Sequence, residues 1–271
     1  MMNMTLEQKA RIGFEVHENH QFPRARVLAL QCAQGELTEY DCPVICESTF
    51  TVVVNGKPLS HLQCSNNALA ELAYGFLFNE GVIAGLNDVN SFVLDTTNLV
   101  ASFEVTSMGA DVLVPVRSSG FGGFALTLSE SATTLEDPVT HEATSFSMSD
   151  ITYAITTMQS FAREYTITRG IHCSALFAAR RPLASFEDIG RHNTFDKLAG
   201  ASLLRGFTTQ GTLLATTGRV SSEMVRKATR LGVAGIVSLS GPTDQAIKLA
   251  NDTNLFLAGY VRNDSGTIYT C

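Results

Sequence analysis

The second half of the chain alternates strand-like and helix-like segments, and this alternation constrains the fold more than any other feature. Apolar runs typical of strands (CSALFAA, TLLAT and GIVSLS) alternate with helix-like segments (NTFDKLAGASLL, SEMVRKATRLG and DQAIKLAND). A further helix near Ser149 has apolar residues at helical spacing, namely Ile151, Ala154, Ile155, Met158 and Phe161. Such a chain buries its apolar surface by packing helices on a sheet. We therefore predict an α/β part at residues 146–271.

The first half is predicted to form a smaller α+β part, at residues 37–128. The stretch FTVVVNGKPLSHLQ has two β-rich runs around Asn55-Gly56, a dipeptide typical of hairpin turns. The stretch ALAELAYGFLFNEGVI predicts an amphipathic helix, with Asn67 as its N-cap and Gly81 after its last turn. The runs SFVL, VASFEV and VLVPV predict strands. The fold class is therefore α/β in the second half and α+β overall.

Two segments lack a regular pattern. Residues 1–36 show little period, so we predict a partly ordered lead-in and assign no element to it. Residues 129–145 are polar and rich in turn formers, and we predict a linker or exposed loop between the two parts.

Composition and charge narrow the class of protein. The 271 residues are 45% hydrophobic, which is enough to build a large core without disulfides or metals. The net charge of -7 argues against broad nucleic-acid binding. No apolar run approaches the roughly 18 residues of a membrane span, and the start lacks a signal-peptide pattern. The six cysteines form no C-x-x-C pair and are interpreted as reduced thiols. We expect a soluble, cytoplasmic protein with no nucleic-acid or membrane partner.

The loop RSSGFGGFA, at residues 117–125, places Gly120, Gly122 and Ala125 at the G-x-G-x-x-A spacing of dinucleotide-binding turns. That fingerprint requires a helix after the glycines and an acidic residue about 20 positions further on. Here FALTLSES alternates like a strand, and the nearest acidic residues, Glu136 and Asp137, lie in the predicted linker. These departures favour a glycine-rich turn between strands.

Three predicted strand-to-helix junctions carry polar residues. EDIGRHNTFDKL, TTGRVSSEMVRKA and SGPTDQA each follow or end a strand-like run and lead into a helix. Helix N-termini and arginines favour anions, so these junctions suit phosphate groups. An ordinary capped helix start, with Asp188 or Asn193 as the cap of the first, remains the alternative.

The sequence favours a metal site and a nucleophilic cysteine less than it favours phosphate-binding junctions. His172, Cys173 and His192 are suitable ligand types, but the zinc deaminase motifs H-x-E and P-C-x-x-C are absent. We predict no metal. Cys173 lies in an apolar strand, which should raise its pKa and leave little thiolate for a Cys-His pair.

Seven segments, in this order, resemble the formate dehydrogenase accessory family, FdhD/NarQ: VNGKPLSHLQCSNNALAELAYGFLFNEGVI, RSSGFGGFA, TRGIHCSALF, FEDIGRHNTFDKLAG, TTGRVSSEMVRKA, SGPTDQAIKLA and LAGYVRNDSGTIYT. The resemblance covers about residues 40–270. It implies a cytoplasmic homodimer whose larger part is a three-layer, cytidine-deaminase-like α/β/α domain without the zinc site. It also implies transfer of sulfur from a cysteine desulfurase to molybdenum bis(molybdopterin guanine dinucleotide), which activates formate dehydrogenase.

The resemblance also implies residues that bind this cofactor. The segment near the C-terminus associated with it corresponds here to Tyr260, Val261, Arg262, Asn263, Asp264 and Ser265. Arg262 is suited to bidentate pairing with phosphate, although the segment also fits a strand followed by a hairpin turn. At the phosphate-friendly junctions we expect contributions from His172, Arg191, His192, Gly218, Arg219 and Ser221. The match favours a site role for Glu187 and Asp188 without naming their chemistry.

This sequence departs from the family in the glycine-rich loop. The family loop reads S-S-C-G-x-C-G, and its cysteines are thought to carry persulfide sulfur, whereas Ser119 and Gly122 occupy those positions here. Sliding the register by one residue gives Gly120 and Gly123 instead. A serine hydroxyl cannot hold a sulfane sulfur, because the transfer needs a thiolate.

Three hypotheses follow from the missing cysteines. Sulfur transfer could use another thiol: Cys64, whose pKa a following helix N-terminus would lower, or else the terminal Cys271. The chain could instead be a non-enzymatic cofactor chaperone or a regulator of a paralogue. A metal-dependent hydrolase or deaminase is the third hypothesis.

Overall fold

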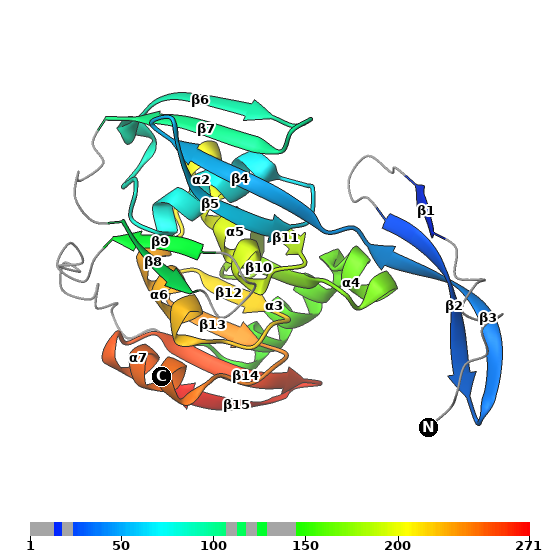
Figure 1. Ribbon diagram of the computed structural model, residues 1–271. Helices are drawn as coiled ribbons and strands as arrows, with labels where there is room; N and C mark the ends of the chain where they lie inside the picture. Colours follow the sequence, from blue (N-terminus) through cyan, green and yellow to red (C-terminus); the bar gives the residue numbers. More distant parts are fainter. Residues whose placement is uncertain (1–13, 18–23, 107–112, 118–123, 129–144) are drawn as a thin grey trace.

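The computed structural model describes residues 14–17, 24–106, 113–117, 124–128 and 145–271. Its strands form four sheets, of which the largest has six strands in the order β11-β10-β12-β13-β14-β15. Figure 1 shows this sheet and a four-stranded sheet lying on opposite sides of helices α2 and α5, with a separate hairpin standing beside them.

The six-stranded sheet brings several strand ends to one edge. Its strands are β10 (His172–Ala178), β11 (Arg181–Asp188), β12 (Leu213–Thr216), β13 (Gly235–Ser238), β14 (Phe256–Arg262) and β15 (Ser265–Thr270). Strands β12, β13 and β14 are parallel, whereas β10 runs antiparallel to both β11 and β12. The carboxyl ends of β11, β12, β13 and β14 therefore lie at the same edge as the start of β10.

Helices cover both faces of this sheet, so the predicted three α/β/α layers are present. One face packs on α3 (Met148–Phe161), and the other packs on α5 (Arg191–Arg205), α6 (Ser222–Leu231) and α7 (Asp244–Asp252). Alternation within β10 explains the two layers, because Phe177 faces α3 while Leu176 faces α5 and α6. The expected core face of α3 is confirmed except at Phe161, which is exposed. The short helix α4 (Arg163–Thr168) follows α3.

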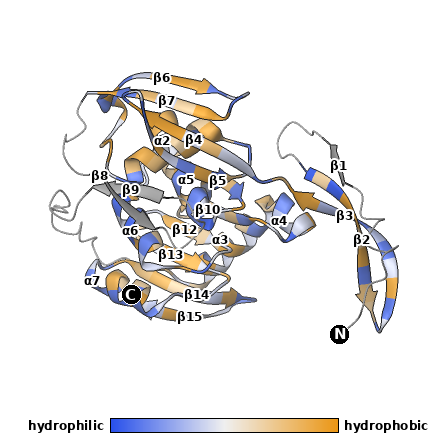
Figure 2. Ribbon diagram, viewed as in Figure 1, coloured by the Kyte–Doolittle hydropathy of each residue, from blue (hydrophilic) through white to orange (hydrophobic). Residues whose placement is uncertain are grey.

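The predicted hairpin and helix of the first half are confirmed. A four-stranded sheet, ordered β5-β4-β7-β6, contains β4 (Ser48–Val54), β5 (Lys57–Cys64), β6 (Val89–Asp95) and β7 (Val100–Val105). Asn55 and Gly56 both have positive φ, as a two-residue hairpin turn requires. Helix α2 (Leu69–Asn79) packs on this sheet, and the short 3₁₀ helix η1 (Leu86–Asp88) precedes β6. Figure 2 shows strands β4, β7 and β13 coloured mainly as hydrophobic.

Helices α2 and α5 touch through their backbones. A Cβ atom added at Gly75 would overlap the carbonyl of Asp196, and one added at Gly200 would overlap the carbonyl of Glu71. Only glycine permits this approach on both sides. The contact joins the four-stranded sheet to the α/β layers through the α2–α5 pair.

The sequence analysis missed a long hairpin near the start of the chain. Strands β2 (Arg24–Ala33) and β3 (Glu36–Ile45) pair along their full length, and β1 (Phe14–His17) pairs with β2. Residues 24–33 and Glu36 of the predicted lead-in therefore belong to regular strands, with a turn at residues 34–35 between them. An ion pair between Arg24 and Glu164, with Nε 3.2 Å from Oε2, ties the base of the hairpin to α4.

The glycine-rich loop connects two antiparallel strands. Strand β8 (Leu113–Arg117) pairs with β9 (Phe124–Leu128), and β9 contacts β5. The predicted strand after the glycines is therefore confirmed, and it argues against the dinucleotide fingerprint, which opens a helix. Residues 118–123, with Ser119, Gly120, Gly122 and Gly123, lie outside the described residues, as does nearly all of the predicted linker at 129–145.

Candidate functional site

The edge of the six-stranded sheet brings together most of the predicted site residues. His172 starts β10, Arg191 and His192 start α5, and residues 217–221 connect β12 to α6. A Cβ added at Gly218 would lie 3.0 Å from Cβ of Arg191 and 3.5 Å from Nδ1 of His172. The glycine therefore lets the β12–α6 connection approach the start of α5. The structure therefore brings these junction residues together at one edge of the sheet.

Hydrogen bonds fix the β12–α6 connection from both sides. The Thr217 hydroxyl accepts from the backbone N–H of Cys173 at 3.0 Å and lies 3.3 Å from Nδ1 of His172. Ser238, at the end of β13, donates to the carbonyl of Gly218 at 2.7 Å, and Ser240, just after the strand, donates to the carbonyl of Thr217 at 3.0 Å. The backbone of this edge is thus held rigidly by its neighbours.

Three buried polar atoms at this edge lack a hydrogen-bond partner among the described residues. They are Nε of Arg191, Nε2 of His192 and the hydroxyl of Ser221. Ser221 is the N-cap residue of α6, yet its side chain makes no capping bond. Buried polar groups are normally satisfied, so unpartnered ones at a helix start are typical of a site that awaits an anionic ligand.

The charged groups around these atoms include Arg191, Arg219 and Lys227, with Glu223 and Asp196 as acidic neighbours. Burial, Lys227 and Arg191 lower the pKa of His192 to about 4, which keeps the imidazole neutral at pH 7. Burial and the nearby Arg191 likewise lower the pKa of His172. Arg219 is exposed at the same edge, and its charge contributes to lowering the pKa of Arg191. Two guanidinium groups beside a helix N-terminus favour phosphate.

The predicted C-terminal segment lies at the end of β14, on the same edge. Nη1 of Arg262 donates to the carbonyl of Leu239 at 2.8 Å, so part of its guanidinium is already occupied. Asn263 and Asp264 have positive φ and make the turn into β15, which confirms the predicted strand and hairpin turn. Tyr260 is exposed. The side chain of Val261, between Tyr260 and Arg262, is buried in the core against α3 and does not face the edge.

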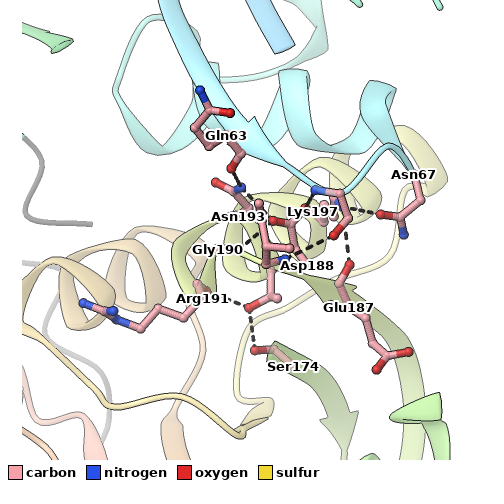
Figure 3. Close-up of polar contacts among 12 residues, drawn as sticks. Gln63, Asn67, Ser174, Glu187, Asp188, Gly190, Arg191, Asn193 and Lys197 are labelled. Atoms are coloured by element: carbon pink, nitrogen blue, oxygen red, sulfur yellow. Dashed lines mark hydrogen bonds and ion pairs between the residues drawn. The ribbon is translucent and has the colours of Figure 1, made fainter. Parts of the chain in front are cut away.

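Asp188 is the centre of a buried hydrogen-bond network just behind this edge (Figure 3). Its carboxylate accepts from the backbone N–H groups of Ser65 and Gly190 and from the amide of Asn193, at 3.2, 2.8 and 2.8 Å. It also pairs with Lys197 at 2.5 Å, and both side chains are fully buried. Neither Asp188 nor Asn193 caps α5, because Gly190 is the N-cap residue and no side chain bonds there.

Glu187 has a structural role on the opposite side of β11. Its carboxylate accepts from the backbone N–H groups of Glu164 and Tyr165, at 3.1 and 2.7 Å, at the start of α4. Burial raises the pKa of this carboxyl. The expected site role of Glu187 therefore lacks support in these contacts.

A second buried charge network was missed by sequence reasoning. Nζ of Lys227 lies 2.8 and 2.9 Å from the two carboxylate oxygens of Asp196, and 3.6 Å from Oε1 of Glu80. Glu223, one helical turn before Lys227, lies 3.6 Å from Nδ1 of His192. The four-residue spacing of Glu223 and Lys227, which places both on one face of α6, was the available signal in the sequence. Their partners could not be found from it, because these lie on α5 and just after α2.

The structure contradicts the reasoning for Cys64 as a substitute sulfur carrier. Cys64 ends β5 and is fully buried, and burial together with Asp188 raises its pKa to about 12. The expected lowering of the Cys64 pKa by the α2 N-terminus is therefore wrong. For Cys173 the expected raised pKa, to about 12, is confirmed. Cys271 is exposed.

The predicted N-cap of α2 is also wrong. The side chain of Asn67 accepts a hydrogen bond from Lys197, and Ala68 is the N-cap residue.

Neither a metal cluster nor a membrane helix occurs in the described part of the chain. Among those residues, no three His, Cys, Asp or Glu side chains gather closely enough to hold a metal ion. No described helix has both the length and the apolar character needed to cross a membrane.

Comparison with known proteins decides the family. The model of the FdhD/NarQ family matches residues 45–271. The chain belongs to the FdhD/NarQ family. It is 32% identical over 241 residues to the sulfur carrier protein FdhD of Bacillus licheniformis, which covers 87% of this chain and 91% of that protein. It is also 32% identical over 247 residues to the FdhD of Bacillus subtilis, with 88% and 92% covered.

A solved structure supports the fold of this FdhD-family chain. The crystal structure, described as a formate dehydrogenase accessory protein from Desulfotalea psychrophila, superposes with a TM-score of 0.73 at 21% identity. The match covers 92% of this chain and 97% of that one. The mixed α/β architecture is therefore shared along nearly the whole length of both chains.

Proposed function

We propose that this chain binds molybdenum bis(molybdopterin guanine dinucleotide) as its cargo and supports the activation of formate dehydrogenase. The observation that carries the proposal is the group of unpartnered buried atoms on Arg191, His192 and Ser221. Their position at the starts of α5 and α6 suits the phosphates of a dinucleotide. Membership of the FdhD/NarQ family supports this choice of cargo.

Residues along the same edge complete the proposed site. Arg219 would pair with phosphate from the exposed side of the α6 start. Tyr260 and the turn after Arg262 lie at the end of β14, where they would contact the rest of the dinucleotide. We further propose a cytoplasmic homodimer with a cytidine-deaminase-like α/β/α part; the three helix–sheet–helix layers support that likeness.

Sulfur transfer would have to use a thiol outside the glycine-rich loop. A receiving thiolate attacks the terminal sulfur of the desulfurase persulfide, forms a new S–S bond and releases the desulfurase cysteine as a thiolate. Cys64 and Cys173 are poor receivers, because burial raises both pKa values to about 12. The exposed Cys271 is the better candidate.

A cofactor-binding protein without sulfur chemistry is the second candidate function. It is favoured by Ser119 and Gly122 at the family's cysteine positions and by the burial of Cys64 and Cys173. Such a chaperone or regulator would bind the same cargo and carry no sulfane sulfur.

Incubation with a cysteine desulfurase and isotopically labelled cysteine tests the sulfur step. Mass spectrometry would map persulfide on each of the six cysteines, with Cys271→Ser as the matched variant. Label on Cys271 that is lost in the variant, and lost on addition of sulfur-free cofactor, supports transfer. No label together with tight GDP binding supports the second candidate. Failure to bind GDP would reject both.

A further inference from the structure

We propose that Asp188 is a positioning residue that aligns the start of α5 with the end of β5 and thereby sets the geometry of the proposed cargo site. This inference rests on the proposed function, because cargo binding is one of its readouts. Asp188 itself faces no ligand: it is fully buried and every contact of its carboxylate is internal.

The carboxylate joins two parts of the chain that lie far apart in sequence. On the α5 side, Oδ1 accepts from Gly190 and Asn193. On the β5 side, Oδ2 accepts from the backbone N–H of Ser65. Oδ2 also pairs with Lys197 of α5, so a single rigid group holds the two segments.

Neighbouring bonds repeat the same connection. The Asn193 amide also donates to the carbonyl of Gln63 at 2.8 Å, and the Ser65 hydroxyl accepts from the backbone N–H of Ile189 at 3.2 Å. Lys197 extends the link to Asn67 at 2.8 Å. A Cβ at Gly190 would lie 2.7 Å from Nδ2 of Asn193, so the bend before α5 has no spare room.

The network reaches the site through consecutive residues and through hydroxyl groups. Arg191 and His192, which carry two of the unpartnered atoms, directly follow Gly190. The Thr194 hydroxyl donates to the carbonyl of Arg191 and meets Ser174, which donates to Thr216 at the end of β12. On the other side, β5 contacts β9 of the β8–β9 hairpin. From one buried position, Asp188 thus determines the placement of both the α5 start and the end of β5, which contacts the β8–β9 hairpin.

The decisive experiment compares full-length variants in their folded state. Asp188→Leu combined with Lys197→Met replaces the buried pair by apolar groups and leaves neither charge unpaired. We expect a lower urea midpoint, because Ser65, Gly190 and Asn193 lose their acceptor. Without urea, we expect a GDP dissociation constant raised about tenfold or more and faster amide hydrogen exchange at residues 63–67 and 189–193. Arg205→Gln is the control, because it breaks the exposed ion pair with Glu71 between the same helices.

A second variant keeps the inference testable if the double variant does not fold. Asn193→Ala removes the bonds to Asp188 and Gln63 without leaving a buried charge unpaired. Wild-type GDP affinity and exchange rates in a folded variant, in either design, would overturn the positioning role. If the wild-type protein does not bind GDP, the proposed function fails, and hydrogen exchange without ligand still decides the role of Asp188.

Discussion

The network around Asp188 and the sheet edge in front of it differ in how their polar groups are satisfied. In the network, the buried Asp188 carboxylate accepts from four donors, one of which is its ion-pair partner Lys197. At the edge, where α5 and α6 begin side by side, the Ser221 hydroxyl, Nε of Arg191 and Nε2 of His192 have no partner among the described residues. A polar group that is saturated contributes to structure, whereas one left unpaired is available for a ligand.

Breaking the buried Asp188–Lys197 pair should have the largest effect on stability. Lys197→Met leaves Asp188 as a buried, uncompensated charge, which typically costs about 3–5 kcal/mol of folding free energy. Urea unfolding would measure the loss, with Lys248→Met on the exposed face of α7 as the matched control. Equal midpoints for both variants would mean that the α5 junction is no more structural than the surface.

The pH dependence of stability should come next in size. The unfolded chain protonates His192 near pH 6.5, whereas the folded protein does so only near 4. Between these values the unfolded state binds more protons, so stability falls as the pH falls, by roughly 3 kcal/mol over the window. His192→Gln should remove this contribution, whereas that of His172, whose pKa burial also lowers, is present in both proteins. Glu80, whose pKa is raised by burial, makes stability rise as the pH falls, but wild type and His192→Gln share this contribution.

Urea unfolding of wild type and His192→Gln at several pH values between 4 and 7 would measure this difference. His61→Gln, on the exposed face of β5, is the control for losing an imidazole elsewhere. Parallel pH profiles for wild type and His192→Gln would contradict the assignment of the buried, neutral His192.

At the unsaturated junction, Ser221→Ala should separate binding from stability. The hydroxyl has no partner among the described residues, so the free energy of unfolding should stay within about 0.5 kcal/mol of wild type. The GDP dissociation constant should rise about tenfold, because a hydrogen bond to a charged phosphate contributes about 1.5–3 kcal/mol. Isothermal titration calorimetry would measure it. A stability loss without an affinity loss would show that Ser221 is structural after all.

A substitution at the third junction, before α7, should give the smallest effect. In contrast to Ser221→Ala, it should lower stability and leave GDP affinity unchanged. The Thr243 hydroxyl accepts from the backbone N–H of Ala246 at 3.3 Å, as an ordinary N-cap does. Thr243→Ala should cost about 1 kcal/mol of stability. GDP affinity should not change. A drop in affinity comparable to that of Ser221→Ala would erase the distinction between the junctions.

Local patterns predicted the fold well where neighbouring residues determine it. The Asn55-Gly56 turn and most strands and helices of the second half follow from short-range signals, whereas β11 and α4 were not predicted. The β2–β3 hairpin was missed, because its strands are only partly buried and show no clean alternation. The turn at Gln34-Gly35 was its one local signal.

The site was less predictable, because its energetics depend on distant partners. The junctions at Arg191 and Gly218 were found from glycine, arginine and helix starts. The burial of Cys64 and the pairing of Asp188 with Ser65 require contacts across more than a hundred residues, and no local pattern encodes them. Lys227 likewise reads as an ordinary helix-surface lysine until Asp196 is placed beside it.

The contact between Gly75 and Gly200 has a consequence for synthesis of the chain. Helix α2 supplies apolar residues to the core of the four-stranded sheet, but its other side is completed only by α5, more than a hundred residues later. The first half therefore leaves the ribosome with an open helix face and must wait for the second half. Such late, non-local closure slows folding and prolongs exposure to aggregation. Newly made chains should accordingly depend on chaperones until α5 emerges.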